Sequence, residues 1–317
     1  MPELAPHALA DVPPEAGTSK PDPILVVEDA RRSFGGLQAV NVDHLEVQRG
    51  SITALIGPNG AGKTTFFNLL TGFDRPDSGT WTFDGTRVSG WASHRVARAG
   101  MVRTFQLTKA LTRLTCIENM KLGATEQRGE RFSAAVWHRL WREQEATIEA
   151  RADTLLERFR MDHMRDELAG TLSGGQRKLL EMARALMTEP MMVMLDEPMA
   201  GVNPALTQSL LEHIRDLPKQ GMTVLFVEHD MDVVMDISDW VVVMAQGRII
   251  AEGPPRQVAR NSEVIDAYLG KDHGDESRFT PVPRVGNTTH IPDAAVALDP
   301  PSDDEGAELL ADDEEPR

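Results

Sequence analysis

Between residues 24 and 270, short apolar runs rich in β-branched side chains alternate with segments long enough to form helices. This alternation is typical of an α/β protein with a parallel sheet. It predicts strands over residues 24–27, 52–56, 191–195 and 223–227, and a strand pair over residues 240–245 and 248–251.

Local signals mark where some of these elements begin and end. Gln246-Gly247 predicts the turn of the strand pair. Asn203-Pro204 predicts a helix start, because Asn caps helices and proline is favoured at the first helical position. A helical stretch is expected over about residues 133–160, with Trp137, Leu140 and Trp141 on one face. We interpret these tryptophans as core residues; contact with a membrane or a partner protein, aided by nearby arginines, is the alternative.

The two ends of the chain differ in composition from its centre. The formal net charge is −16; residues 1–23 contribute −3 and residues 271–317 contribute −9, which leaves −4 for residues 24–270. Both ends are rich in proline, and acidic blocks such as 312–315 bury too little apolar surface to offset the entropy of ordering. The sequence therefore predicts disordered tails over 1–23 and 271–317 around one folded domain. Solubility is the simplest role for the acidic tail, and regulation is the alternative.

Composition also excludes several classes of function. The acidic balance, with an isoelectric point near 5.0, argues against a nucleic-acid-binding surface, which needs a basic stripe. Cys116 is the only cysteine, so neither an internal disulfide nor a Cys-rich metal site is expected. No apolar run approaches the length of a membrane span, and the start of the chain lacks the pattern of a signal peptide. A cytoplasmic protein is expected.

The strongest motif is a match to G-x-x-x-x-G-K-[ST] between the predicted strand 52–56 and an apolar helical run. Glycines let successive backbone N–H groups converge on phosphate oxygens, and the following helix adds its positive end. The lysine can reach the β- and γ-phosphates, and the hydroxyl can bind Mg²⁺. The motif predicts a nucleoside triphosphate site at Gly57, Pro58, Asn59, Gly60, Ala61, Gly62, Lys63 and Thr64.

Two acidic residues follow the predicted strand 191–195. In an open parallel sheet, ligands bind beyond the carboxyl ends of the strands, so Asp196 and Glu197 are expected to face the phosphates. Asp196 suits the Mg²⁺ shell, through water, and Glu197 can orient and polarise the attacking water.

One further string narrows the class of P-loop protein. Leu172-Ser173-Gly174-Gly175-Gln176 reads as a helix capping box, with Ser173 as the cap and Gln176 three residues on. It also resembles the signature of the ATP-binding-cassette (ABC) nucleotide-binding subunits. The resemblance implies a P-loop NTPase core with a parallel sheet, an antiparallel β subdomain and a helical subdomain over about 107–190. It further implies that Ser173, Gly174, Gly175 and Gln176 close over an ATP held by a second ABC ATPase subunit.

Other motifs occur in the order of that family. Phe34 stands where the family has an aromatic that stacks on adenine, and Gln106 matches the glutamine that touches Mg²⁺ and water. His229 matches the switch histidine after the last core strand, and Thr65 completes the phosphate-binding residues. The resemblance thus assigns Glu197, His229 and Lys63 to catalysis, and Thr64, Gln106 and Asp196 to the metal. Asn203 stands where many members have Asp. This difference argues against a charged group at position 203 that couples the two subunits.

The amino acids within these motifs are most similar to those in the ATPases of branched-chain amino acid importers. The similar strings are 34–40, 102–106, 200–204, 228–231 and 267–270. The resemblance implies ATP and Mg²⁺ as cofactors, permease subunits and a solute-binding protein as partners, no nucleic acid, and a position on the inner face of the plasma membrane. Members usually end near the last of these strings, so it assigns no role to residues from 271 onward.

Three alternatives differ in class. An ABC exporter ATPase would have the same motifs, because nothing on this chain contacts the transported substrate. A non-transport ABC clamp of DNA repair or translation would need a long coiled coil or two cassettes, and the charge is wrong for nucleic acid. A P-loop kinase or GTPase would not need the Leu-Ser-Gly-Gly-Gln string.

Overall fold

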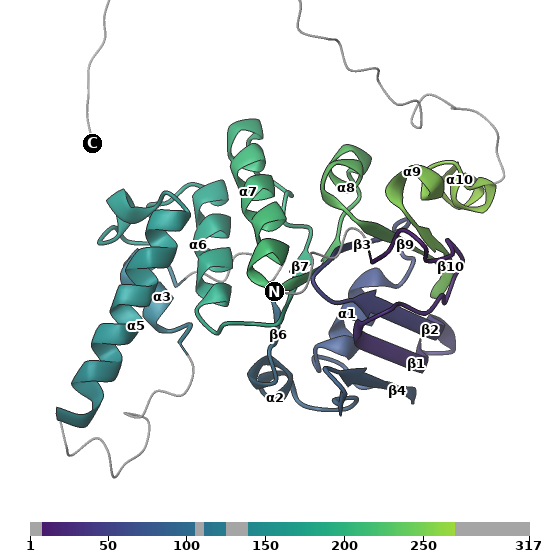
Figure 1. Ribbon diagram of the computed structural model, residues 1–317, viewed down its shortest axis with the longest axis horizontal. Helices are drawn as coiled ribbons and strands as arrows, with labels where there is room; N and C mark the ends of the chain where they lie inside the picture. The colour runs from purple at the N-terminus through teal and green to yellow at the C-terminus, as the bar shows by residue number, and fades with distance from the viewer. Residues whose placement is uncertain (1–7, 105–110, 125–138, 270–317) are drawn as a thin grey trace, which may run out of the picture. The chain divides into compact units, whose positions relative to one another are not determined.

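A six-stranded sheet, with the order β10-β9-β3-β8-β7-β6, forms the centre of the structure (Figure 1). The computed structural model describes residues 8–104, 111–124 and 139–269. The sheet is parallel except for the β9–β10 pair. All residues of β3, β7 and β8 are buried, as expected for parallel strands covered on both faces. The strands are β3 (Ile52–Ile56), β6 (Met101–Arg103), β7 (Met192–Asp196), β8 (Thr223–Val227), β9 (Trp240–Ala245) and β10 (Arg248–Gly253).

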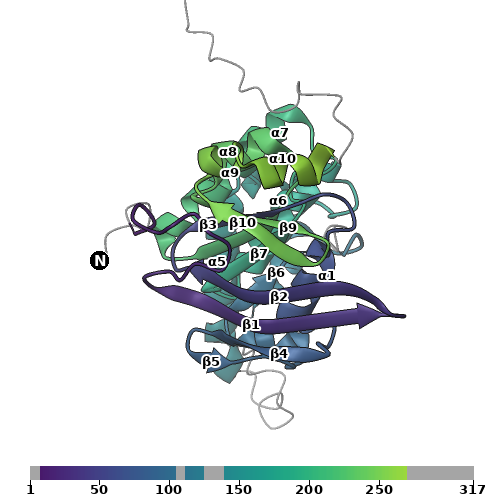
Figure 2. The same ribbon diagram turned by 90° about the vertical axis from the view of Figure 1, so that its right-hand side faces the viewer.

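A second, antiparallel sheet has the order β2-β1-β4-β5, and Figure 2 shows β2, β1 and β4 one below another. Helix α1 (Lys63–Leu70) contributes Phe66 and Phe67 to a core that includes residues of both sheets. This packing fixes the start of α1, and with it the phosphate loop, against the rest of the fold. The strands are β1 (Pro23–Phe34), β2 (Leu37–Gln48), β4 (Ser78–Phe83) and β5 (Thr86–Arg87).

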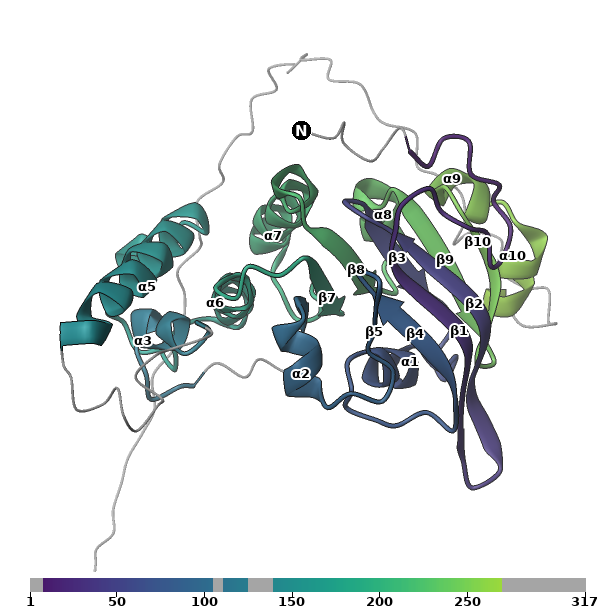
Figure 3. The same cartoon turned by 60° about the horizontal axis from the view of Figure 1, so that its bottom comes forward.

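Helices α3 (Cys116–Lys121), α5 (Arg139–Arg158) and α6 (Gly174–Leu186) pack together beyond the β6 edge of the central sheet (Figures 1 and 3). They share a second core with β3, β7 and β8. No helix in the described ranges combines the length and hydrophobicity that crossing a membrane requires. The remaining helices are α2 (Ser93–Arg98), η2 (Asp162–Met164), α7 (Pro204–Asp216), η3 (Pro218–Gln220), α8 (Met231–Ile237), α9 (Pro255–Val258) and α10 (Ser262–Leu269).

The elements predicted from hydrophobic patterning are present. β3, β8 and β9 have the predicted bounds, β7 is shifted by one residue, and β1 and β10 run longer than predicted. Asn203 caps α7 with its side chain, which accepts the N–H of Leu206, and Pro204 is the first helical residue. Of the helix expected over about residues 133–160, the structure describes α5, Arg139–Arg158. Trp137 and the side chain of Trp141 lie outside the described residues.

The N-terminal segment over residues 8–22 packs against the domain, so the prediction of a disordered tail over 1–23 is wrong for these residues (Figure 3). Leu9 is buried, and the buried ammonium of Lys20 lies 2.8 Å from the carboxylate of Glu252 in β10. The same carboxylate accepts hydrogen bonds from the indole of Trp240 and from the N–H groups of Gly17 and Thr18. Composition missed this segment because a few specific contacts, rather than many apolar residues, order it.

Replacing Glu252 by Gln is expected to lower the free energy of unfolding by about 3 kcal/mol, since one partner of a buried ion pair is then left without its counter-charge. Urea denaturation followed by tryptophan fluorescence measures the change. Asp216→Asn is the control, because its exposed ion pair with Lys219 is worth less than about 1 kcal/mol. Equal stability of the Glu252→Gln variant and the wild type would contradict the importance of this contact.

Candidate nucleotide-binding site

The predicted nucleotide-binding segments meet at one edge of the central sheet. Leu55 of β3 pairs with Val227 of β8, and Val227 pairs in turn with Asp196 of β7. These three parallel strands therefore end at the same level. The phosphate loop, the acidic pair and His229 follow them directly, at the edge where open α/β sheets bind ligands.

Two glycines of the phosphate loop are required by close backbone approach. A Cβ on Gly57 would lie 2.0 Å from the carbonyl oxygen of Met244, and one on Gly62 would lie 2.2 Å from that of Ala39. Both residues have positive φ angles, 152° and 101°, which side-chain-bearing residues rarely adopt. Gly62 caps the N-terminus of α1, so the loop delivers its backbone N–H groups to the positive end of that helix.

Lys63 is folded over the phosphate loop. Its ammonium donates to the carbonyl oxygens of Gly57, at 2.6 Å, and Pro58, at 3.0 Å. Burial lowers the pKa of Lys63, while the nearby carboxylates of Glu197 and Asp196 oppose this shift. The lysine is thus partly desolvated and lies within electrostatic reach of both acids. Thr64 is exposed in the first turn of α1, and Thr65 is partly exposed.

Asp196 forms a buried ion pair that was not predicted. Arg103, on the neighbouring strand β6, donates to Asp196 Oδ2 at 2.6 Å, and the two side chains are 6% and 4% exposed. Arg103 also donates to the side-chain oxygen of Asn68 in α1, at 2.6 Å. The arginine therefore connects the acidic strand end to the helix after the phosphate loop. No sequence spacing indicates this contact, which depends on the pairing of β6 with β7.

Glu197 occupies a tight turn immediately after β7. Its φ of 46° is left-handed, and its N–H donates to the carbonyl oxygen of Val227 at 3.0 Å. The buried carboxylate of Glu228 accepts the N–H of Met199 at 3.0 Å and that of His229 at 3.2 Å. Burial raises the pKa of Glu228. These bonds tie the loop of Glu197 to the end of β8, although nothing in the sequence singled out Glu228.

Two other predicted residues are accessible to a ligand. The side chain of His229 is 64% exposed at the end of β8. Phe34 is 47% exposed at the end of β1, next to the tip of the β1–β2 hairpin, with the Arg32 guanidinium 4.4 Å from its ring centroid. The exposure of Phe34 argues against a role as a core residue. Gln106 lies outside the described residues.

The signature string forms the predicted capping box. Ser173 Oγ accepts the N–H of Gln176 at 3.3 Å, and the Gln176 side chain accepts the N–H of Ser173 at 2.9 Å. Gly174 and Gly175 start α6, which ends at Leu186. Helix α6 lies with α3 and α5, whereas α1 lies on the far side of β7 (Figures 1 and 3). The nearest neighbours of a Cβ placed on Gly174 or Gly175 would be Gly201, Val202 and Leu206, which follow the Glu197 loop and are not part of the phosphate loop.

The side chains at this edge of the sheet could bind a metal ion whose other ligands are mainly phosphate oxygens of a nucleotide. Within residues 8–104, 111–124 and 139–269, no group of three or more His, Cys, Asp or Glu side chains is arranged to hold an ion. Thr64 and Asp196 supply one hydroxyl and one carboxylate. Such a sparse oxygen set suits Mg²⁺, which keeps several waters and shares the phosphates of its substrate.

Residues 40–200 match the ABC transporter family, and residues 248–274 match the family described as branched-chain amino acid ATP-binding cassette transporter. The chain belongs to the ABC transporter family, and within it to the subunits that bind and hydrolyse ATP.

Several relatives share nearly their whole length with this chain. The branched-chain amino acid transport ATP-binding protein BraF of Pseudomonas aeruginosa is 42% identical over 251 residues, which is 78% of this chain and 98% of the relative. The corresponding LivG protein of Escherichia coli is 41% identical with the same coverage. A nucleotide-free ATP-binding cassette from an ABC transporter is similar in structure, with a TM-score of 0.69 and 36% identity over 78% of this chain and all of that one. The ADP conformation of such a cassette gives a TM-score of 0.67 and 35% identity, over 78% of this chain and 99% of that one. The predicted fold class, the resemblance and the ATPase activity are thereby confirmed.

Proposed function

We propose that this chain drives the import of branched-chain amino acids or related small polar solutes by hydrolysing ATP at the cytoplasmic face of a membrane permease. The relatives named for branched-chain amino acid transport are covered almost end to end, and this is the observation that carries the proposal. The match of residues 248–274 to a branched-chain amino acid transporter family supports the same branch. Export by the same machinery is the second candidate, but the named relatives favour import.

The nucleotide is held by the phosphate loop and its neighbours. The N–H groups of Gly60–Thr65 and the positive end of α1 bind the phosphates, and Lys63 exchanges its two carbonyl partners for phosphate oxygens. Phe34, exposed beside the hairpin tip, stacks on the adenine. Mg²⁺ neutralises phosphate charge when bound, with Thr64, Gln106 and Asp196 as its protein partners. Arg103 orients Asp196 by holding its Oδ2 atom.

Hydrolysis uses groups that follow the parallel strands. Glu197 accepts a proton from the attacking water, because it is placed one residue beyond Asp196 at the edge of the phosphate site. His229, exposed after β8, contacts the γ-phosphate side of the nucleotide. Positioning and charge stabilisation supply most of the rate in phosphoryl transfer, so the geometry of these side chains decides the activity.

A second subunit completes the site. Since the nearest neighbours of Gly174 and Gly175 are Gly201, Val202 and Leu206 and not residues of the phosphate loop, we infer that Ser173–Gln176 close over the ATP of a second ABC ATPase subunit. The capping box leaves the N–H groups of Gly174 and Gly175 at the positive end of α6 for the γ-phosphate. Permease subunits hold this pair at the membrane, and a solute-binding protein delivers the solute. Nucleic acid is not a partner of so acidic a chain.

Membrane purification of the full-length chain tests the proposal. The chain is expected to co-purify with permease subunits, and vesicles that contain the complex are expected to take up radiolabelled leucine only when ATP is supplied on the side of this subunit. The Glu197→Gln complex is the control for uptake without hydrolysis. Purification with permeases but ATP-driven release of solute in the opposite direction would replace import by export.

A further inference from the structure

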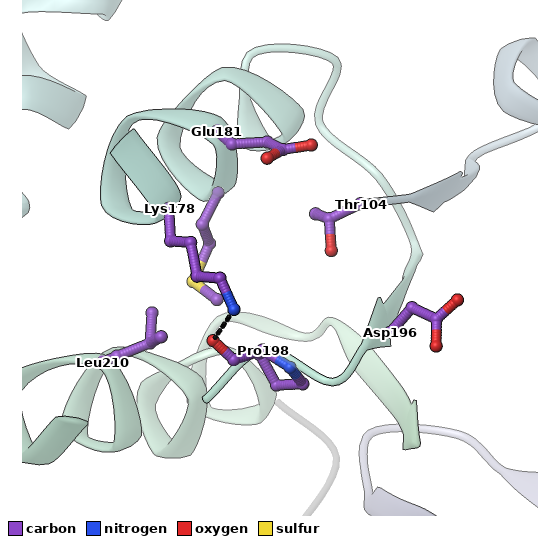
Figure 4. Close-up of a pocket in the computed structure, with 7 residues that line it drawn as sticks. Thr104, Lys178, Glu181, Asp196, Pro198 and Leu210 are labelled. Atoms are coloured by element: carbon purple, nitrogen blue, oxygen red, sulfur yellow. Dashed lines mark hydrogen bonds between the residues drawn. The ribbon is translucent and has the colours of Figure 1, made fainter. Parts of the chain in front are cut away.

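The loop that carries Glu197 is bound by a lysine of α6, the helix that begins with the signature glycines. Lys178, in α6, donates to the carbonyl oxygen of Glu197 at 3.1 Å, of Pro198 at 3.0 Å and of Ala200 at 2.5 Å. Figure 4 shows the ammonium directed at the loop, on the side of a small cavity that Asp196 also lines. One side chain thus contacts three of the four residues from Glu197 to Ala200.

The chemistry of this contact suits an ammonium group. Lysine carries three N–H donors and no acceptor, and three carbonyl oxygens of one loop converge on them. Burial lowers the pKa of Lys178, whereas the carboxylates of Glu228, Glu181 and Glu197 raise it. The carbonyl oxygens and these three acids compensate the desolvated charge.

A buried acid holds the same loop by a different backbone group. Glu228 Oε1 accepts the N–H of Met199, and the Glu228 side chain is 1% exposed. The loop therefore offers its carbonyl oxygens to a cation and an N–H group to an anion. With the bond from the Glu197 N–H to Val227, these contacts leave the backbone of Glu197 little freedom.

Lys178 lies on the same face of α6 as the signature glycines. It follows Gly174 by four residues and Gly175 by three, which are the spacings of neighbours on a helix surface. A Cβ on Gly175 would lie 2.6 Å from Leu206 Cδ1 and 3.3 Å from Val202 Cγ1, so the start of α6 is packed tightly against the end of the Glu197 loop and the start of α7. Lys178 thus contacts the loop from Glu197 to Ala200, and Gly175, one turn earlier in α6, contacts the residues that follow this loop.

We propose that Lys178 is a positioning residue that couples the signature helix to Glu197, so that the helix and the loop bearing the water-activating carboxylate move together when the nucleotide site closes. The inference rests on the proposed role of Glu197. Lys178 itself is not placed in contact with ATP. Its removal should therefore disturb the chemical step without disturbing nucleotide binding.

Lys178→Met in the full-length chain tests this coupling, because methionine keeps the apolar stem and removes the donors. We expect kcat to fall about 10- to 100-fold, since misplacing a reacting group by about 1 Å costs on this order. The KM for ATP and the binding of a fluorescent ATP analogue are expected to change by less than about 3-fold, because the phosphate loop is untouched. Turnover is expressed per titrated nucleotide site, so that partial unfolding does not enter the comparison.

Three variants make the outcome decisive. Lys178→Arg keeps a charge and several donors, although its planar guanidinium differs from an ammonium, and is expected to recover part of kcat, whereas Lys178→Gln is expected to lose it as Lys178→Met does. Lys219→Met, at an exposed ion pair, is the control for the substitution itself. Wild-type kcat in a folded Lys178→Met variant, or in Lys178→Gln if the former does not fold, would overturn the inference. A Glu197→Gln variant with normal turnover would instead refute the role of Glu197.

Discussion

Glu197→Gln is expected to lower kcat for ATP hydrolysis by about 10²- to 10⁴-fold, the range for losing a positioned general base. Glutamine has nearly the same shape, so the left-handed turn and its N–H bond to Val227 are kept while the proton acceptor is removed. The three carbonyl groups that hold the loop to Lys178 are also unchanged. The effect should therefore appear in the chemical step.

Phosphate release by the full-length chain in Mg²⁺ and ATP measures this loss, and titration with a fluorescent ATP analogue measures binding on the same preparation. Binding is expected to stay within about 2-fold of the wild type, because the phosphate loop is not altered. Glu212→Gln, an exposed glutamate of α7, is the matched control. Unchanged turnover in Glu197→Gln would move the general base to another group.

Lys63→Ala is expected to weaken ATP binding by about 10- to 100-fold, because hydrogen bonds to charged groups contribute about 1.5–3 kcal/mol. The ammonium is presented at the phosphate loop and is partly desolvated, so its contribution is larger than that of an exposed lysine. Titration with the fluorescent ATP analogue gives the dissociation constant directly.

Lys219→Ala is the control for this variant, since that lysine forms an exposed ion pair with Asp216. The melting temperature of Lys63→Ala without nucleotide should stay close to that of the wild type, and its increase on adding ATP should be reduced. Wild-type affinity for ATP would contradict the assignment of Lys63 to the phosphates.

Local patterns were sufficient to predict five of the six central strands, all but β6, and the position of the phosphate loop between a strand and a helix. Fully buried parallel strands such as Thr223–Val227 are continuous apolar runs, and their bounds follow from hydrophobicity alone. The phosphate loop and the capping box at Ser173 are local too, because each is formed by consecutive residues whose spacing carries the chemistry.

Contacts between distant segments could not be predicted in this way. Arg103 reaches Asp196 because β6 pairs with β7, and Lys178 reaches the loop of Glu197 because α6 packs beside it. Neither pairing leaves a signal in the spacing of the residues. The N-terminal segment was misjudged for the same reason: Lys20 is ordered by Glu252, 232 residues further along the chain.

The central claim is that two ABC ATPase subunits enclose ATP between them. Sedimentation of the Glu197→Gln variant tests it most directly, with the mass of the protein determined first in ATP and then in ADP. The account predicts a dimer with ATP, formed by two copies or by one copy and a second ABC ATPase subunit, and single subunits with ADP. Single subunits in ATP, both alone and with the second ATPase subunit and the permease supplied, would contradict it.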